Sequence, residues 1–303
     1  ALEALGHPRD YYIDYTLGET VRQLEKFWKP ALAAGRPVAA RNPAGLAYLL
    51  ARMSTRELVS LKPSRVVLDE LVSRPGVPMS DRHKALDGLA GLKRTDRLTE
   101  LVSAIGVSDA GDSAEANLVL FDLAHMLTGQ SPRQLATVRG QLEKMATGSR
   151  RAETRQIGFA ALLAADGKSG AAWQLAVRSK GGRRDLLDGL PLVPDPALRD
   201  SLFPRIKPLL AAPGKPVTAE ARSLRRSSFN AAAALPGHQA EVFRILAGFA
   251  RSGDQRRAAV QAISKIPKYR WAKTAAAPLI ASLLEFARSV PAKQRTRADV
   301  RDA

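Results

Sequence analysis

The four histidines are the first residues to weigh for chemistry, because histidine binds metals and transfers protons near neutral pH. His7, His83, His125 and His238 stand far apart in the sequence, and none belongs to an H-E-x-x-H motif. The sequence contains no cysteine, which excludes disulfides, thiolate metal sites, a cysteine nucleophile and covalently attached c-type haem within these residues. We therefore expect this chain to bind neither a metal ion nor a cofactor.

Two carboxylates near the start, Asp10 and Asp14, are spaced to lie on one face of a helix among tyrosines. Such a pair can act in acid–base catalysis when burial raises one of the two pKa values. Arg9 and Arg22 flank the pair, so ion pairing is the preferred interpretation. No catalytic role is assigned to these carboxylates.

Glycine and serine motifs add no catalytic signal. The segments 167–170 and 181–184 are rich in glycine and basic residues, but they lack the spacing of a phosphate-binding loop and follow no expected strand. No serine lies in a G-x-S-x-G context. We expect both segments to be turns between helices, and the chain not to be an enzyme.

Basic residues carry the remaining chemical signal, since 47 Lys and Arg against 29 Asp and Glu give a net charge of +18. Such a surface attracts nucleic acid, acidic polysaccharide, anionic membranes or acidic proteins. One interpretation is structural: repeated arginines pair with Asp185, Asp188, Asp254 or Glu220 on an adjacent turn. The other is functional: a ladder of arginines holds an anionic partner through bidentate contacts. The candidate partner-binding residues are Arg155, Arg183, Arg184, Arg225, Arg226, Arg256, Arg257, Tyr12 and Trp28.

Helices are the elements that must position these residues. Alanine and leucine dominate the apolar residues, aromatic residues make up only 5%, and apolar positions recur with the helical period. Ser131 before Pro132 is typical of a helix start. The pattern predicts an all-α protein without strand pairs, with helices that include residues 12–28, 64–71, 115–127, 132–145, 154–164, 219–234, 239–250, 255–266 and 275–287.

A repeat of about 35 residues runs through this pattern. Its register places a basic residue before two apolar residues, which follow it by four and seven positions. Short helices gain stability by stacking in such arrays, and the uneven spacing favours HEAT-like helix pairs that form a solenoid; the alternative is an irregular helical bundle. The matching triplets are Arg82/Leu86/Leu89, Arg155/Phe159/Leu162, Arg183/Leu187/Leu190, Arg225/Phe229/Ala232 and Arg256/Val260/Ile263, with Ala116/Leu120/Leu123 as a weaker copy.

We expect one repeat domain over residues 1–303, with residues 290–303 as an exit linker. Residues 1–35 form an expected N-terminal capping segment, because an uncapped array exposes its core. The side chains expected to make this cap are Tyr11, Tyr12, Tyr15, Phe27 and Trp28. No apolar stretch is long enough to span a membrane. The first residues lack the basic and apolar regions of a signal peptide, so we expect none in this sequence.

The opening segment from His7 to Trp28, followed by Pro30-Ala-Leu, resembles the start of the HEAT-repeat region in planctomycete-type membrane-bound dehydrogenase-like proteins, also described as PVC-type haem-binding proteins. The segment 290–296 is similar to the family's exit from the helical array. In that family, the region lies between a sugar-dehydrogenase-like propeller and a cytochrome c domain with a C-x-x-C-H haem motif.

The resemblance implies a non-catalytic scaffold in an exported, haem-associated dehydrogenase-like protein. Its partners would be the neighbouring propeller and cytochrome c domains, and its location periplasmic or secreted. Charge and fold also allow a second hypothesis, a cytoplasmic nucleic-acid-binding solenoid that resembles HEAT-like DNA-repair glycosylases. The glycosylase pocket needs an aromatic cluster with a carboxylate, and no acidic residue stands convincingly beside Trp173 or Trp271.

Overall fold

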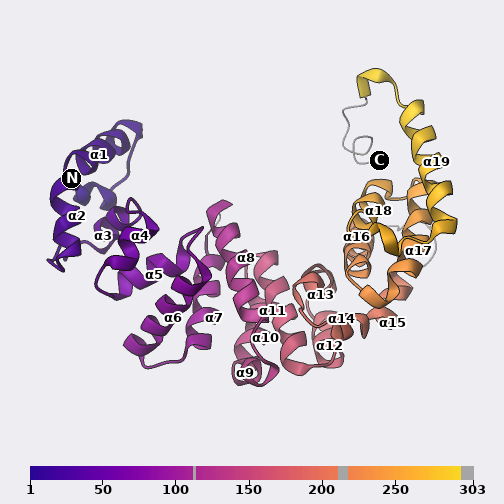
Figure 1. Cartoon of the computed structure of the whole chain (residues 1–303), viewed down its shortest axis with the longest axis horizontal. Coiled ribbons are helices and arrows are strands. Elements are labelled where there is room, and N and C mark those ends of the chain that lie inside the picture. The colour runs from indigo at the N-terminus through magenta and orange to yellow at the C-terminus, as the bar shows by residue number, and fades with distance from the viewer. Residues whose placement is uncertain (112–113, 211–217, 295–303) are drawn as a thin grey trace. The chain divides into compact units, whose positions relative to one another are not determined.

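The computed structural model describes residues 1–111, 114–210 and 218–294, apart from the side chains of 114–116 and 292. The described residues form helices and turns without a β-strand, which confirms the all-α prediction (Figure 1). None of the described helices is both long and apolar enough to cross a membrane. The chain divides into two compact units, Ala1–Leu123 and Ala124–Ala303. The expectation of a single repeat domain stays a prediction.

Unit 1 consists of short helices joined by tight turns. Its helices are α1 (Tyr11–Gln23), α2 (Glu25–Ala33), α3 (Pro43–Leu50), α4 (Thr55–Ser60), α5 (Arg65–Ser73), α6 (Met79–Lys93), α7 (Arg97–Asp109) and the first part of α8 (Ala114–Thr128), with a 3-10 helix at Leu2–Gly6.

Unit 2 contains the end of α8 and eleven further α-helices. These are α9 (Pro132–Thr137), α10 (Arg139–Gly148), α11 (Ala152–Asp166), α12 (Gly170–Arg178), α13 (Gly182–Gly189), α14 (Pro196–Asp200), α15 (Phe203–Ile206), α16 (Ala219–Ala233), α17 (Gln239–Ser252), α18 (Arg256–Ile263) and α19 (Lys273–Ser289). Its 3-10 helices are Leu190–Leu192, Lys207–Leu210, Pro236–His238, Lys268–Arg270 and Ala292–Gln294. The expected exit linker lies mostly outside the described residues.

Each predicted helical segment lies in a helical part of the structure, and two of these segments are each divided between two helices. Residues 12–28 form α1 and α2, which meet at Leu24, and residues 132–145 form α9 and α10, which meet at Val138. Ser131 caps α9 as expected: its hydroxyl accepts from the Gln134 N–H, and the Gln134 side chain accepts from the Ser131 N–H.

The apolar positions of the repeat register face the core. Of the residues four and seven places after the basic position, all are buried except Val260, which is half-buried. The side chain of Ala116, which opens the weaker copy, lies outside the described set. Phe229 shows the packing, since its ring centre lies 4.8 Å from that of Phe249. The apolar stripe predicted from helical periodicity is therefore the helix face that packs in the core.

In unit 2, α11, α13, α16 and α18 contact one another in that order, and α10, α12 and α17 pack against them. Glycines allow the closest approaches. A Cβ built on Gly158 of α11 would lie 2.5 Å from the Ala146 nitrogen of α10, and one built on Gly189 of α13 would overlap the Gln156 carbonyl of α11. Backbone packed against backbone leaves no room for a side chain at these positions.

A buried arginine organises the middle of unit 1. The Arg82 guanidinium is fully buried; it donates to the Val72 carbonyl, to the Arg74 carbonyl at 3.1 Å and to the Asp122 carboxylate at 3.0 Å. Burial lowers the pKa of Arg82, and Asp122 acts in the opposite direction. The first repeat arginine thus serves packing in unit 1.

Candidate functional site

Arg155, the candidate on α11, is held inside unit 2. Its Nε donates to Asp185 Oδ2 at 2.6 Å, and its Nη1 donates to the carbonyls of Ser149 and Arg150 at 2.9 Å each. The Asp185 side chain is 1% exposed and that of Arg155 is 19% exposed. These contacts join α11 to α13, in agreement with the structural interpretation of the repeat.

Arg225 on α16 makes the equivalent link to the next helix pair. Its Nη1 donates at 2.9 Å to Oδ2 of Asp254, a residue that directly precedes the N-cap of α18. Its guanidinium lies over the Phe249 ring. Between these two links, the Ser227 hydroxyl donates to Asp188 at 2.9 Å and joins α13 to α16. Burial raises the pKa of Asp188, while the Ser227 hydrogen bond and Arg184 lower it. Polar contacts therefore connect α11, α13, α16 and α18 at each step.

Arg256 combines an internal contact with a surface position. Its Nε donates to the Ala250 carbonyl at 2.8 Å, and its guanidinium carbon lies 3.8 Å from the centre of the Phe286 ring. The side chain also lines a surface pocket and remains half-buried. The structure thus holds this arginine in one orientation at the edge of a cavity.

The other predicted arginines of unit 2 are exposed. Arg183 and Arg184 lie in the first turn of α13, Arg257 in that of α18, and Arg226 in the middle of α16. Helix α13 contacts α16, and α16 contacts α18, so these side chains lie on a connected set of helices in unit 2. We call this set the arginine edge: Arg183, Arg184, Arg226 and Arg257.

Two pockets open along the arginine edge. A smaller one, of about 180 Å³, is lined by Lys180, Arg183 and Arg184, with Glu220 also in its wall. A larger one, of about 650 Å³, is lined by Arg226, Arg256 and Arg257 together with Gln255, Gln261 and Phe286. Arginine guanidinium groups at a solvent-filled pocket are suited to carboxylates and phosphates.

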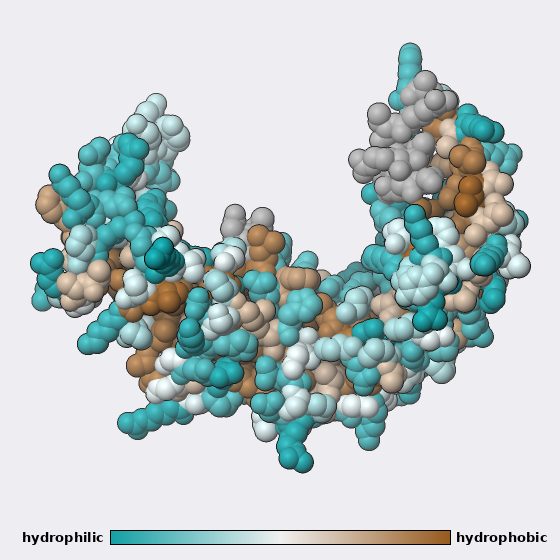
Figure 2. All heavy atoms as spheres, viewed as in Figure 1, coloured by the Kyte–Doolittle hydropathy of each residue, from teal (hydrophilic) through white to brown (hydrophobic). Residues whose placement is uncertain are grey.

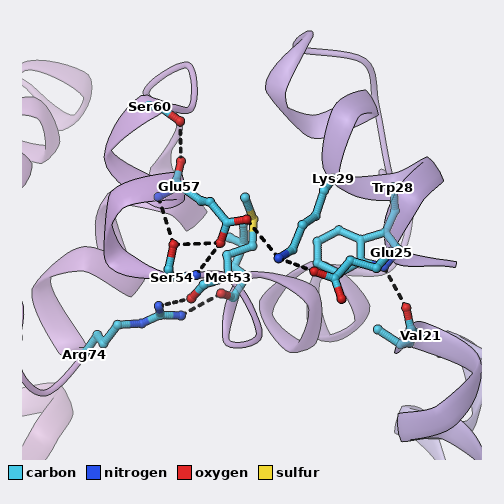
Figure 3. A network of polar contacts seen from close by, with 10 residues as sticks. Val21, Glu25, Trp28, Lys29, Met53, Ser54, Glu57, Ser60 and Arg74 are labelled. Atoms are coloured by element: carbon cyan, nitrogen blue, oxygen red, sulfur yellow. Dashed lines mark hydrogen bonds and ion pairs between the residues drawn. The ribbon is translucent and has the colours of Figure 1, made fainter. Parts of the chain in front are cut away.

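Unit 1 holds the two aromatic candidates, and they differ in exposure. Trp28 is 8% exposed, and its indole Nε1 donates to the Val21 carbonyl at 2.9 Å. Lys29 beside it bonds Glu25 and, at 2.9 Å, Glu57, whose carboxylate also accepts from Ser54 (Figure 3). Trp28 is therefore a core residue, which corrects its assignment to a binding surface.

Tyr12, by contrast, is 76% exposed, and Tyr11, Tyr15 and Phe27 also face solvent. Of the five rings expected to cover the core, Trp28 alone is buried. The reason is geometric: helix α1 buries Leu17 and Val21 on one face, and the tyrosines lie elsewhere on it. Whether residues 1–35 cap an array stays a prediction.

The carboxylates near Tyr12 have structural partners. Asp10 caps α1 by accepting from the Ile13 N–H at 2.8 Å, and Asp14 pairs with Arg9 at 2.8 Å. The pair of Asp14 with Arg9 confirms the ion pairing expected for Asp14. A pocket of about 320 Å³ beside Tyr12 is lined by Asp10, which is exposed.

The histidines show no metal-binding arrangement in the part of the chain that the structure describes, where no group of three or more His, Asp and Glu side chains could hold an ion. His238 instead stacks on Phe203, with ring centres 3.8 Å apart. This ring stacking contributes to the packing of unit 2.

Gln255 and Phe286 are pocket residues that sequence reasoning did not select. Gln255 adopts the left-handed conformation with φ of 52°, and both polar atoms of its side chain are buried without a hydrogen bond. Neither residue has a local signal, since glutamine near a helix start is common and Phe286 reaches the pocket only through the packing of α19. Comparisons with models of known protein families, with curated proteins and with solved structures find no match to this chain.

Proposed function

We propose that this protein is a HEAT-like solenoid that works as a non-catalytic binding module for an anionic macromolecule. The helix pairs of unit 2, each linked to the next by an arginine or serine contact, support a stacked array. In this proposal, Arg155 and Arg225 stabilise the array, and the arginine edge contacts the partner.

The observation that carries the binding proposal is the division of the arginines into two sets. Arg155 and Arg225 are 19% and 14% exposed and pair with aspartates of the next helix pair. The four residues of the arginine edge have exposed side chains, and the Nε of Arg184 also lies 3.8 Å from Asp185 Oδ1. Exposed charges of one sign on neighbouring helices raise the local concentration of an oppositely charged partner and accelerate its association. The net charge of +18 extends this attraction over the whole protein.

A binding assay with a matched control tests the proposal. The variant Arg183→Ser/Arg184→Ser/Arg226→Ser/Arg257→Ser removes the arginine edge; the control Arg133→Ser/Arg178→Ser/Arg244→Ser/Arg288→Ser removes the same charge from exposed sites of unit 2. Fluorescence anisotropy with labelled polyglutamate and with duplex DNA at ~50 mM salt measures affinity. We expect at least about tenfold weaker binding for the edge variant than for the control. Equal losses in both variants, or no binding by the wild type, would reject the site.

On the resemblance of residues 7–32, we further propose that the module belongs to an exported haem-associated dehydrogenase-like protein, in which it positions a propeller and a cytochrome c domain. The genomic reading frame tests this directly. It should encode a propeller before these residues and a C-x-x-C-H motif after them. If the frame lacks either of these features, the proposal of a haem-associated protein fails and the proposal of a binding module remains.

A further inference from the structure

We propose that the start of α1 docks on α19 of a second copy of this protein, so that molecules associate head to tail. Two surfaces meet in this contact. The tyrosine face consists of Tyr11, Tyr12 and Tyr15. The α19 stripe consists of Ala277, Ile280, Ala281 and Leu284. The inference goes beyond the proposed function, because neither surface contains a residue of the arginine edge.

The tyrosine face is an exposed aromatic cluster. Tyr11, Tyr12 and Tyr15 are 75%, 76% and 60% exposed. The Tyr11 ring centre lies 5.6 Å from that of Tyr12 and 6.4 Å from that of Tyr15, so the three rings form one cluster. Tyrosine is enriched at protein interfaces, because its ring buries apolar area while its hydroxyl still forms hydrogen bonds. Such a cluster is typical of an interaction surface.

A pocket beside the tyrosine face can receive an apolar side chain. The pocket has a volume of about 320 Å³, and its lining includes Tyr12, Ile13, Ala4 and the buried Leu17. Side chains that fill a pocket within an interface contribute a large share of the binding energy. The partner of this surface should therefore present branched aliphatic side chains on a ridge.

The α19 stripe is such a ridge. Ile280 and Leu284 are each 51% exposed, and Ala277 and Ala281 on the same face are exposed too. Figure 2 shows the hydrophobic side chains along α19. The four positions follow one another by three or four residues, which places them on one face of the helix. Because the alanines are small, the two branched side chains protrude and can enter a pocket.

Cations at both ends of the stripe oppose its pairing with itself. Lys273 precedes the stripe by four residues and Arg288 follows it by four, so both belong to the same helix face. Both are exposed, and neither has an ion pair among the described residues. In an antiparallel pair centred on the stripe, Lys273 of one copy would face Arg288 of the other. In a parallel pair, each cation would face its own counterpart. Like charges in contact oppose association.

The charge around the tyrosine face is of the opposite sign. Residues 1–23 contain four Asp and Glu against two Arg, whereas residues 268–294 contain one Glu against five Lys and Arg. The two arginines near the tyrosines are already neutralised, in the pairs Arg9–Asp14 and Arg22–Glu19. The carboxylates of Glu3 and Asp10 are exposed and have no ion pair among the described residues.

These features make the two surfaces complementary. Lys273 and Arg288 can lie against tyrosine rings, which attract cations, or against the carboxylates of Glu3 and Asp10. Ile280 and Leu284 can fill the pocket beside Tyr12. Because two different surfaces meet, the contact is heterologous, and it either continues from copy to copy or closes into a ring.

Sedimentation velocity over about 5–200 µM protein tests the association, because a contact of modest size is detected at such concentrations. Wild-type protein should form oligomers whose fraction rises with concentration. Tyr11→Ser/Tyr12→Ser/Tyr15→Ser and Ile280→Ser/Leu284→Ser should each weaken association at least about tenfold. The replaced side chains are exposed, so circular dichroism should show both variants folded.

The matched control removes two apolar side chains elsewhere. Leu92→Ser/Val177→Ser changes positions that are 58% and 51% exposed on α6 and α12, and it should associate like wild type. Equal weakening in the control and the surface variants would overturn the inference. A wild type that stays monomeric at about 200 µM would overturn it as well.

Mixing the two surface variants tests the head-to-tail arrangement. The tyrosine variant keeps its α19 stripe, and the α19 variant keeps its tyrosine face. Each should therefore be monomeric alone, and an equimolar mixture should form dimers and nothing larger. If the tyrosine variant dimerises alone, the α19 stripe pairs with itself. If the α19 variant dimerises alone, the tyrosine face pairs with itself. Either result overturns the inference.

Removal of the cations gives an effect whose sign depends on the partner. Lys273→Gln/Arg288→Gln should weaken head-to-tail association by about threefold to tenfold, whereas it would strengthen a contact between two α19 stripes. The arginine-edge variant should associate like wild type, since its substitutions lie outside both surfaces. Loss of self-association in that variant would overturn the inference, and loss of anion binding alone would bear only on the proposed function.

Discussion

The Arg155 Nε lies 2.6 Å from Asp185 Oδ2, so the first turn of α11 is tied to the first turn of α13, 30 residues further along the chain. Asp185 is almost completely shielded from water, and Arg155 also closes the turn after α10 through the Ser149 and Arg150 carbonyls. One side chain thus fixes two neighbouring helices and the turn that precedes them.

Removal of the Asp185 charge should destabilise unit 2. In Asp185→Asn, the Arg155 guanidinium keeps its partly buried position without its counter-ion, and loss of one partner of a buried pair costs about 3–5 kcal/mol. Urea denaturation followed by circular dichroism measures the change in the free energy of unfolding. Arg183→Ser, which removes an exposed arginine in the same helix, is the control and should change it by less than about 0.5 kcal/mol. Similar values for the two variants would contradict this role of the ion pair.

Substitution by alanine should have opposite effects on stability at two glycines, one packed against a neighbouring helix and one with open space around it. Gly158→Ala places a methyl group against the backbone of α10, and overpacking of this kind costs about 1–3 kcal/mol. Gly248→Ala on α17 meets nothing within 4 Å and should stabilise the protein by up to about 1 kcal/mol through helix propensity. Thermal denaturation of the two variants measures both effects. A Gly158→Ala protein as stable as Gly248→Ala would show that α10 and α11 separate easily.

Unit 1 should lose stability in acid through Glu57. The hydrogen bond from Lys29, followed by those from Ser54, lowers the pKa of Glu57 from 4.5 to about 2. Because the folded-state pKa lies below the unfolded value, this contribution is complete above pH 4.5 and disappears as the pH falls to about 2. The side chain is 39% exposed, so solvent screening limits the effect to about 1 kcal/mol.

Unfolding free energies measured from pH 6 to pH 2 for the wild type and Glu57→Gln test this dependence. The variant should be less stable near neutral pH, and the difference should shrink towards pH 2. A constant difference across this range would show that the ionisation of Glu57 does not contribute to stability. Glu3→Gln, at an exposed position, is the matched control.

Salt should weaken binding of an anionic partner in proportion to the arginines involved. For duplex DNA, the slope of log affinity against log salt is about 0.9 per phosphate neutralised. The arginine-edge variant should therefore lose up to about four units of slope relative to wild type, whereas the exposed-arginine control should retain the wild-type slope. Equal slopes for all three proteins would indicate attraction by the net charge without a defined site.

Helix α19 also carries exposed apolar side chains. Figure 2 shows hydrophobic side chains along α19, where Ile280 and Leu284 are each 51% exposed. These residues lie four apart, on one face of the helix, and Leu279 packs on another.

The sequence by itself determined the helical class and much of the packing. Apolar positions at helical spacing identified Phe159, Leu187 and Phe229 as core residues, because periodicity reports which stripe of a helix avoids water. Helix starts such as Ser131 were also readable, since a cap depends on residues only three positions apart. The excess of basic residues, and the absence of cysteine chemistry, follow from composition alone.

Only the tertiary structure decided which charged residues remain available. Arg155 and Arg183 occupy the same repeat position, yet Arg155 is held by Asp185 and Arg183 faces solvent. The local sequence does not predict a partner 30 residues away, because the pairing depends on how neighbouring helices stack. The burial of Trp28 and the unpaired amide of Gln255 have the same origin: each depends on distant segments that meet only in the folded chain.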